Sequence, residues 1–320
     1  MKHHSKGCLH TNKTPVISDF HVLDCITCKL TRYHPGRPYC ALSYVWGPPK
    51  HGKQKKWRAL SNSQLSNYPR VIKHAIHATN SLGFRYLWVD KYCIEQKNMS
   101  IKAAQIAVMD QIYENTILTI VAAAGQDESY GLPGAGTLPL VSTRSQPTAF
   151  IGNRLAVSIL PDITSALRKS KWATRGWTYQ EAVLYRRRLI FTAQQVFFVC
   201  RTSAQQETIP RFPRLKVYHE YDLRVENVFL PEAYADRETL RVCPVPSAIH
   251  TLQVHIKKYL QRSLPSDGHA LSAFRSILAR SDLWSYWGIP SIPNEGTTML
   301  SSKESDIPSK QFTINSTPKT

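Results

Sequence analysis

Several short runs of the chain are rich in apolar residues. FHVLD (20–24) and CALSYVWG (40–47) have the apolar content of strands, and the Pro- and Gly-containing turn HPGRP separates them. YLWVD (86–90) and ILTIVAAAG (117–125) are almost wholly apolar, which is typical of strands buried on both faces of a sheet. We therefore predict a strand in each of these four runs.

Helical spacing marks the segments between the later strands. Residues 69–83 begin with a proline that suits a first helical turn and end at Gly83, and a second helix is expected from the candidate N-cap Ser100 to about residue 113. Strand, helix, strand, helix, strand over 40–125 predicts an α/β fold with a mostly parallel sheet flanked by helices. The predicted buried positions are Val71, Ile72, Ala75, Ile76, Thr79 and Leu82 in the first helix, and Ile101, Ala104, Val108, Ile112 and Tyr113 in the second.

The downstream half is less regular. A strand is expected within 149–160, a hairpin around Ala-Gln-Gln within 187–200, and helices at 247–262 and 268–281. We expect the chain to divide into a basic flexible arm (1–18), a main domain (19–202, with its motifs in 39–181), a linker or irregular excursion (203–247), a partly helical C-terminal extension (248–300) and a disordered tail (301–320).

Composition favours a packed, water-soluble protein. Hydrophobic residues make up 42% of the 320 residues, enough for a substantial core. No apolar segment follows the basic start MKHHSKG, and the longest apolar run spans about nine residues where a membrane helix needs about twenty. We therefore expect a cytoplasmic protein that does not cross a membrane.

The chain is strongly basic, with a net charge of +19, and residues 1–60 carry eleven Lys and Arg against two acidic residues. Such an excess attracts nucleic acid or other anions, but no zinc-finger, RNA-recognition or helix-turn-helix motif accompanies it. The basic loop GKQKKWR (52–58) holds a single aromatic residue. A solvated basic surface with a flexible arm is the favoured interpretation.

Seven scattered cysteines indicate a reducing compartment rather than a disulfide framework. Cys25 and Cys28 form a single C-x-x-C, which fits a strand running into a turn better than a zinc site because no second pair stands at metal spacing. Cys93 has no evident base nearby and is expected to be a buried, unreactive thiol rather than a nucleophile. We predict no metal site.

Polar residues follow the strands of the predicted parallel sheet, where ligands bind in open α/β folds. No G-x-G-x-x-G or Walker motif is present, so a dinucleotide-binding oxidoreductase or a P-loop enzyme is disfavoured. Each of three residues has a purely structural alternative: a strand-end hydrogen bond for Ser43, a core position for Trp46, and an N-cap or turn carboxylate for Asp90. The candidates are Ser43, Tyr44, Trp46 and Gly47 after the second strand and Asp90, Cys93 and Gln96 after the third.

RGWTYQE (175–181) places Trp177 four residues before Glu181, so the two share a helix face. From these residues alone, Glu181 is either a functional carboxylate or one member of an ordinary ion pair. Its potential arginine partners are Arg175, Arg186, Arg187 and Arg188.

Five blocks in one order resemble the fungal heterokaryon incompatibility (HET) domain. The resemblance spans about residues 39–200 and continues more weakly in RSLPSDGHALSAFRSILAR (262–280) and YWGIP (286–290). The blocks are ALSYVWG (41–47), YLWVDKYCIEQ (86–96), QIAVMDQIYENTILTIVAA (105–123), GLPG (131–134) and RGWTYQE (175–181).

The resemblance implies an effector of non-self recognition and programmed cell death. HET domains are thought to be distant relatives of TIR domains, which have a flavodoxin-like parallel sheet and in many cases hydrolyse NAD⁺ with a glutamate in a W-x-x-x-E setting. Trp177 and Glu181 have that spacing here. The resemblance thus implies a candidate NAD⁺ glycohydrolase, with NAD⁺ as substrate and no cofactor.

Residue roles follow from that resemblance. Glu181 is the expected catalytic carboxylate, and Asp90 orients the site or a ribose hydroxyl. The remaining implied residues are Ser43, Tyr44, Trp46, Gly47 and Trp177 around the substrate, and Cys93, Gln96, Arg175, Gly176 and Gln180 in support of the motifs.

Two competing functions remain open at this stage. One is a non-enzymatic signalling module of the same fold, which acts by self-association or through another incompatibility protein. The other, less favoured, is nucleic-acid binding through the basic N-terminal region.

Overall fold

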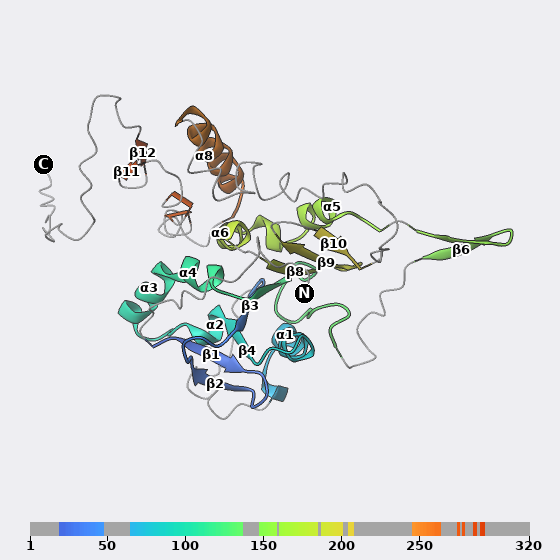
Figure 1. Ribbon diagram of the computed structural model, residues 1–320, viewed down its shortest axis with the longest axis horizontal. Helices are drawn as coiled ribbons and strands as arrows, with labels where there is room; N and C mark the ends of the chain where they lie inside the picture. The colour runs from blue at the N-terminus through green and yellow to red at the C-terminus, as the bar shows by residue number, and fades with distance from the viewer. Residues whose placement is uncertain are drawn as a thin grey trace, which may run out of the picture.

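The computed structural model describes residues 19–47, 65–136, 147–158, 160–184, 187–200, 204–207, 245–263, 274–275, 277–278, 284–286 and 289–291. The predicted arm, the basic loop 52–58, most of the predicted linker and the predicted tail lie outside these residues. The described part is a mixed sheet covered by helices, so the predicted α/β class is confirmed (Figure 1).

Eight strands form the central sheet in the order β10-β9-β8-β5-β3-β4-β1-β2. The inner strands β8, β5, β3 and β4 run parallel, and antiparallel strands extend the sheet at both edges. The strands are β1 (His21–Asp24), β2 (Lys29–Arg32), β3 (Tyr39–Ser43), β4 (Tyr86–Val89), β5 (Leu118–Ala122), β8 (Arg187–Phe191), β9 (Val196–Cys200) and β10 (Ala204–Gln206).

The apolar runs form the inner strands because only a fully covered sheet can bury them. Every residue of β3 and β5 is buried, as are the last three residues of β4. The outer strand β2 has no fully buried residue. The prediction of strands buried on both faces at 86–90 and 117–125 is therefore confirmed.

Helices connect the parallel strands and cover both faces of the sheet. Figure 1 shows α1 on one face and α3, α4 and α6 on the other. This is expected for crossovers of the same hand, because the chain runs from β3 out to β4 and then back to β5 and on to β8. The connections contain η2 (Leu65–Asn67), α1 (Arg70–Ser81), α2 (Asp90–Cys93), α3 (Met99–Ala107), α4 (Met109–Glu114), α5 (Ile163–Arg168), η3 (Trp172–Thr174) and α6 (Gly176–Leu184).

The first predicted helix is confirmed as α1. Five of the six positions of its predicted stripe are buried, and Leu82 is partly buried just beyond the end. Gly83 follows with φ of 80°, a left-handed conformation that stops the helix at little cost for glycine.

The second predicted helix is divided in two, and part of its predicted buried face is wrong. Asn98, rather than Ser100, is the N-cap, since its side chain accepts hydrogen bonds from the amides of Ser100 and Ile101. The backbone leaves helical geometry at Val108, so one stripe cannot continue through both halves. Ile101 and Ala104 are exposed, whereas Ile112 and Tyr113 are buried.

The segment 149–160 forms a two-stranded hairpin rather than one strand. β6 (Thr148–Ile151) and β7 (Arg154–Val157) pair antiparallel around a two-residue turn. Gly152, with φ of 59°, occupies the first turn position, which is the place of glycine in a type II′ hairpin turn. The hairpin is separate from the central sheet and extends outward from the body (Figure 1).

The C-x-x-C segment is the turn between β1 and β2, as the strand-into-turn interpretation predicts. The Asp24 carboxylate accepts a hydrogen bond from the amide of Ile26 at 2.9 Å and pairs with Arg85 at 2.7 Å. Burial raises the pKa of the Cys25 thiol, which favours its neutral form. The described residues contain no group of three or more His, Cys, Asp or Glu suited to a metal ion.

The regions predicted as linker and as helical extension contain mixed structure. α8 (Val245–Leu260) confirms the helix expected at 247–262. β10 lies within the predicted linker, because its three residues pair with β9 at the edge of the sheet. β11 (Trp284–Tyr286) and β12 (Ile289–Ser291) pair with each other inside the predicted helical extension. No helix within the described ranges has the length and apolar character needed to span a membrane.

α8 packs against α6, the helix that contains most of the RGWTYQE motif. The Tyr179 hydroxyl lies 2.7 Å from Nδ1 of His255, and the guanidinium of Arg262 lies 4.6 Å from the centre of the Tyr179 ring. Burial lowers the pKa of His255 to about 3, so its ring is neutral at physiological pH. These contacts bind α6 to a segment more than seventy residues later in the chain.

Replacement of Tyr179 by Phe should therefore destabilise the protein. We expect a loss of about 1–2 kcal/mol in the free energy of unfolding, because the substitution removes one buried hydrogen bond and leaves the ring packing intact. Urea denaturation of Tyr179→Phe measures this loss, and Tyr86→Phe, at a partly exposed tyrosine, is the control. Equal stability of the two variants would contradict the prediction.

Candidate functional site

A buried hydrogen-bonded group lies at the carboxyl end of the central strand β3. The hydroxyl of Ser43 donates a hydrogen bond to Oε2 of Glu181. The indole Nε1 of Trp172 donates to the same Ser43 oxygen at 2.6 Å. All three residues are buried, and Glu181 is 4% exposed. The structure thus brings Ser43 and Glu181 together across 138 positions of sequence.

Local structure around RGWTYQE directs Glu181 inward. The 3-10 turn η3 ends at Thr174, and the hydroxyl of Thr178 donates to the backbone oxygens of Trp172 and Arg175 at 2.6 and 2.8 Å. These bonds fix the first turn of α6 against η3. One turn later, Gln180 and Glu181 are buried, while Trp177 is partly buried against the core.

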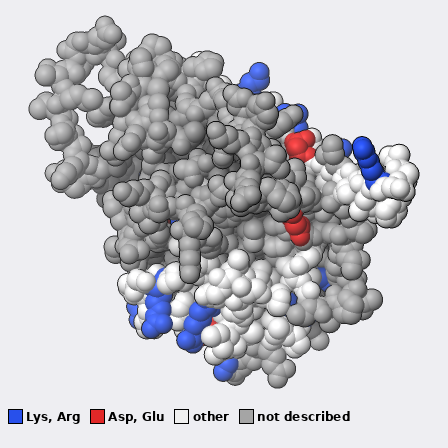
Figure 2. All heavy atoms as spheres, turned by 45° about the vertical axis from the view of Figure 1, so that its right-hand side comes forward, with Lys and Arg blue, Asp and Glu red and all other residues white. Residues whose placement is uncertain are grey.

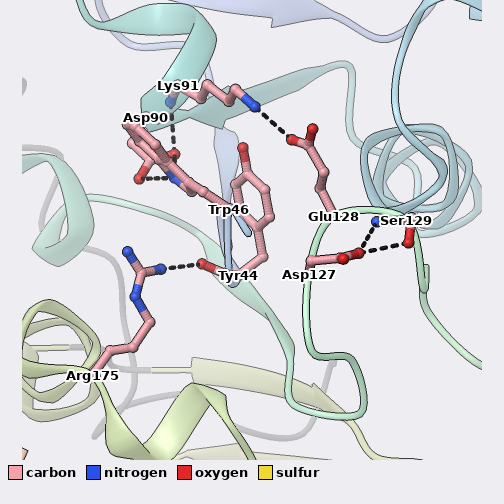
Figure 3. A network of polar contacts seen from close by, with 8 residues as sticks. All are labelled: Tyr44, Trp46, Asp90, Lys91, Asp127, Glu128, Ser129 and Arg175. Atoms are coloured by element: carbon pink, nitrogen blue, oxygen red, sulfur yellow. Dashed lines mark hydrogen bonds and ion pairs between the residues drawn. The ribbon is translucent and has the colours of Figure 1, made fainter. Parts of the chain in front are cut away.

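A second polar group surrounds Asp90, which follows β4. The indole Nε1 of Trp46 donates to both carboxylate oxygens of Asp90, at 3.1 and 3.0 Å (Figure 3). The amide of Lys91 donates to Oδ1 at 2.6 Å, while the Lys91 ammonium pairs with Glu128 at 2.6 Å. The Asp90 carboxylate therefore bonds the Trp46 side chain and the Lys91 backbone, whereas the Lys91 side chain pairs with Glu128.

Arg175 links the two groups. Its Nη1 donates to the backbone oxygen of Tyr44 at 3.0 Å (Figure 3). Tyr44 lies in the sequence between Ser43 and Trp46. The bond ties the start of the RGWTYQE motif to the ALSYVWG motif. The first and last sequence blocks of the predicted site are thus neighbours in space.

The loop that follows β5 closes over the Trp46–Gly47 turn. A Cβ on Gly47 would lie 2.7 Å from the Asp127 side chain, so this close approach requires glycine, and its φ of 82° does so too. The Leu132 amide donates to Nδ1 of His74 on α1, which holds the GLPG end of the loop. Burial lowers the pKa of His74, which keeps that nitrogen available as an acceptor.

Tyr44 is a buried residue that is 4% exposed. Its hydroxyl points toward the Lys91–Glu128 pair in Figure 3, and the described residues offer it no hydrogen-bond partner. Burial raises its pKa well above the usual range, so the hydroxyl stays neutral. The site is therefore a closely packed set of polar groups.

Three other predicted residues, Cys93, Gln96 and Gly176, make hydrogen bonds elsewhere. The Cys93 thiol accepts a bond from the Val89 amide at 3.3 Å, and burial raises its pKa to about 12, in agreement with an unreactive thiol. The Gln96 amide donates locally to the backbone oxygen of Ile94. Gly176 donates its backbone N–H to Ser263 at 2.9 Å.

Sequence reasoning missed three members of the site. Trp172 stands five residues before Trp177 in KWATRGW, and its indole N–H is the signal that could have identified a buried polar partner. Lys91 and Glu128 follow β4 and β5, so their positions after parallel strands carried the same signal as Asp90.

Comparison with known proteins agrees with the motifs. Residues 39–181 match the family model described as heterokaryon incompatibility protein (HET), which covers somewhat less than half of the 320 residues. The resemblance to the HET domain is confirmed over these residues, and the match supports a function of the heterokaryon incompatibility type. Neither the search of curated proteins nor the search of solved structures found a match.

The ionisation of Asp90 should cost the protein stability. Burial raises the pKa of Asp90 from 3.8 to about 6, against the opposing effects of the Lys91 amide and Arg175. Since the folded state binds this proton more tightly than the unfolded state, stability from this group falls as pH rises from about 4 to about 6.

Asp90→Asn should accordingly stabilise the protein at pH 7.5 by about 1–2 kcal/mol, because Asn keeps an acceptor for Trp46 without the buried charge. The advantage should disappear near pH 4, where Asp90 is protonated in the folded protein. Urea denaturation of both proteins at the two pH values measures this. A variant that is less stable at pH 7.5 would show that the carboxylate contributes net stability.

Proposed function

We propose that this protein is a cytoplasmic HET-type effector of non-self recognition and cell death that cleaves the nicotinamide–ribose bond of NAD⁺. The observation that carries the proposal is the contact of Glu181, from the W-x-x-x-E segment, with Ser43 at the carboxyl end of the central parallel strand. Ligands of open parallel sheets bind at that edge.

The order of the parallel strands supports this proposal. Numbered along the chain, β4-β3-β5-β8 reads 2-1-3-4, which is the beginning of the flavodoxin-like order 2-1-3-4-5. In that fold the ligand lies where the first and third strands separate, which here is between β3 and β5. Ser43 ends β3, and the loop that carries Glu128 follows β5.

In the proposed reaction the bond between ribose C1′ and the nicotinamide nitrogen breaks, and neutral nicotinamide leaves. The ribose passes through an oxocarbenium-like state, which the Glu181 carboxylate stabilises. Water then adds to C1′ and releases a proton, which yields ADP-ribose. Asp90 orients a ribose hydroxyl, Tyr44, Trp46 and Gly47 border the substrate, and Trp177 packs beneath it.

Activation requires a change around Glu181. At 4% exposure and bonded to Ser43, this carboxylate is out of reach of a substrate in the described arrangement. We infer that this is a resting state and that self-association moves α6 enough to release Glu181 from Ser43. Activity should therefore depend on clustering of the protein.

The test compares purified wild-type protein and Glu181→Gln, each monomeric and each clustered through a fused oligomeric tag. Clustered wild type should consume NAD⁺, and Glu181→Gln should reduce the rate by about 100-fold or more, since Gln lacks the negative charge. Glu95→Gln is the control, because the Glu95 carboxylate accepts a local hydrogen bond from the Lys97 amide. Equal NAD⁺ loss by wild type and Glu181→Gln would remove Glu181 from the mechanism.

A second candidate function, signalling by assembly alone, is favoured by the β6–β7 hairpin. Directly opposed residues share a face of a hairpin, so the pairs Phe150–Leu155 and Thr148–Val157 form one mostly apolar face. Phe150, Leu155 and Val157 are 76%, 55% and 48% exposed. Such an exposed face suits contact with a second copy of the chain.

The two functions separate in cells. If assembly alone kills, Glu181→Gln kills as well as wild type, whereas Phe150→Ser with Leu155→Ser does not. Ala149→Ser with Ala156→Ser alters the opposite face and is the matched control. If NAD⁺ cleavage kills, loss of killing follows Glu181→Gln together with preserved cellular NAD⁺.

A further inference from the structure

Arg175 and Asp90 lie on the same side of the Tyr44–Trp46 segment without forming an ion pair with each other (Figure 3). They are close enough for Arg175 to lower the pKa of Asp90. The described residues give the guanidinium one hydrogen-bond acceptor, the backbone oxygen of Tyr44, which leaves most of its N–H groups available. The N–H groups of a guanidinium are arranged to bind an anionic group such as a phosphate.

The position of Arg175 is fixed from several directions. Arg175 forms a parallel β-bridge with Ser263, and the backbone amide of Ser263 donates to the backbone oxygen of Thr174 at 2.7 Å. Nη1 of Arg262 donates to the backbone oxygen of Arg175 at 3.3 Å. The segment after α8 thus holds the backbone while Tyr44 holds one edge of the guanidinium. This preorganisation reduces the entropy that binding would otherwise cost.

The other charged groups nearby are already engaged. Lys91 pairs with Glu128 at 2.6 Å and stands 6.0 Å from the centre of the Trp46 ring. Asp90 accepts hydrogen bonds from Trp46 and the Lys91 amide but, as a carboxylate, retains further acceptor capacity. Around Tyr44, the described chain therefore presents a free guanidinium edge beside an acceptor carboxylate.

We propose that Arg175 and Asp90 recognise a ribose phosphate, with the phosphate on Arg175 and a ribose hydroxyl on Asp90. A guanidinium matches two phosphate oxygens at once, and a carboxylate accepts from hydroxyl groups. A sugar phosphate carries a phosphate and hydroxyl groups on one small molecule. One ligand can therefore bind Arg175 through its phosphate and Asp90 through a hydroxyl, which keeps the phosphate away from the carboxylate. The site consequently selects nucleotides over nucleosides.

This inference rests on the proposed function for the place where the substrate binds, but it does not require cleavage. The test uses Glu181→Gln as the background, clustered as in the activity experiment, so that ligands remain intact. The probes are nicotinamide mononucleotide and nicotinamide riboside, which differ by one phosphate. Isothermal titration calorimetry measures both dissociation constants.

We expect the mononucleotide to bind at least tenfold more tightly than the riboside. Arg175→Gln should abolish that difference by weakening only the mononucleotide, and Arg175→Lys should restore part of it. Asp90→Asn should weaken both ligands by a similar factor. Arg85→Gln, which removes an arginine at the start of β4 on the opposite edge of the sheet, should change neither.

Three outcomes would overturn the inference. They are equal affinity for the two ligands, a phosphate preference that survives Arg175→Gln, and no measurable binding of the mononucleotide. Thermal denaturation of each variant verifies folding, and Arg175→Lys keeps the test valid if Arg175→Gln unfolds. Absence of NAD⁺ cleavage by wild type would refute the proposed function and leave these binding results standing.

Discussion

The hydroxyl of Ser43 accepts a hydrogen bond from Trp172 and donates one to Glu181, and the site depends on this arrangement. One small side chain at the end of β3 thereby joins the sheet, the turn η3 and the helix α6. A buried carboxylate is costly without donors, so the contact also constrains the orientation of α6. Arg175 and the ALSYVWG segment are brought together by that same orientation.

The site keeps ionisable groups in buried surroundings that oppose charge. Asp90 has a pKa raised to about 6 by burial, and Tyr44 carries a buried hydroxyl without a partner among the described residues. Neither feature is explained by stability, since an apolar or amide side chain would remove the cost. Such costs concentrate where a protein binds or reacts, which is the physical basis for assigning function to this edge of the sheet.

The folded unit is larger than the segment that matches the HET family model. That match ends at residue 181, inside α6. The strand β8 completes the parallel core, and α8 with the residues after it contacts Tyr179, Thr174 and Gly176. Segments beyond the matched region therefore determine where the last motif of that region lies.

The sequence by itself determined the α/β class, the inner strands, the first helix and the list of polar residues after the strands. These follow from local apolar periodicity and from the rule that parallel strands end at a common edge. It could not predict the break at Val108 or the hairpin at Gly152, which depend on backbone geometry at single residues. Only the tertiary structure decided that Ser43 meets both Glu181 and Trp172, and that Arg175 meets Tyr44 rather than an acid. Those contacts join residues about 130 positions apart, and packing of whole helices, not local pattern, sets which side chains meet.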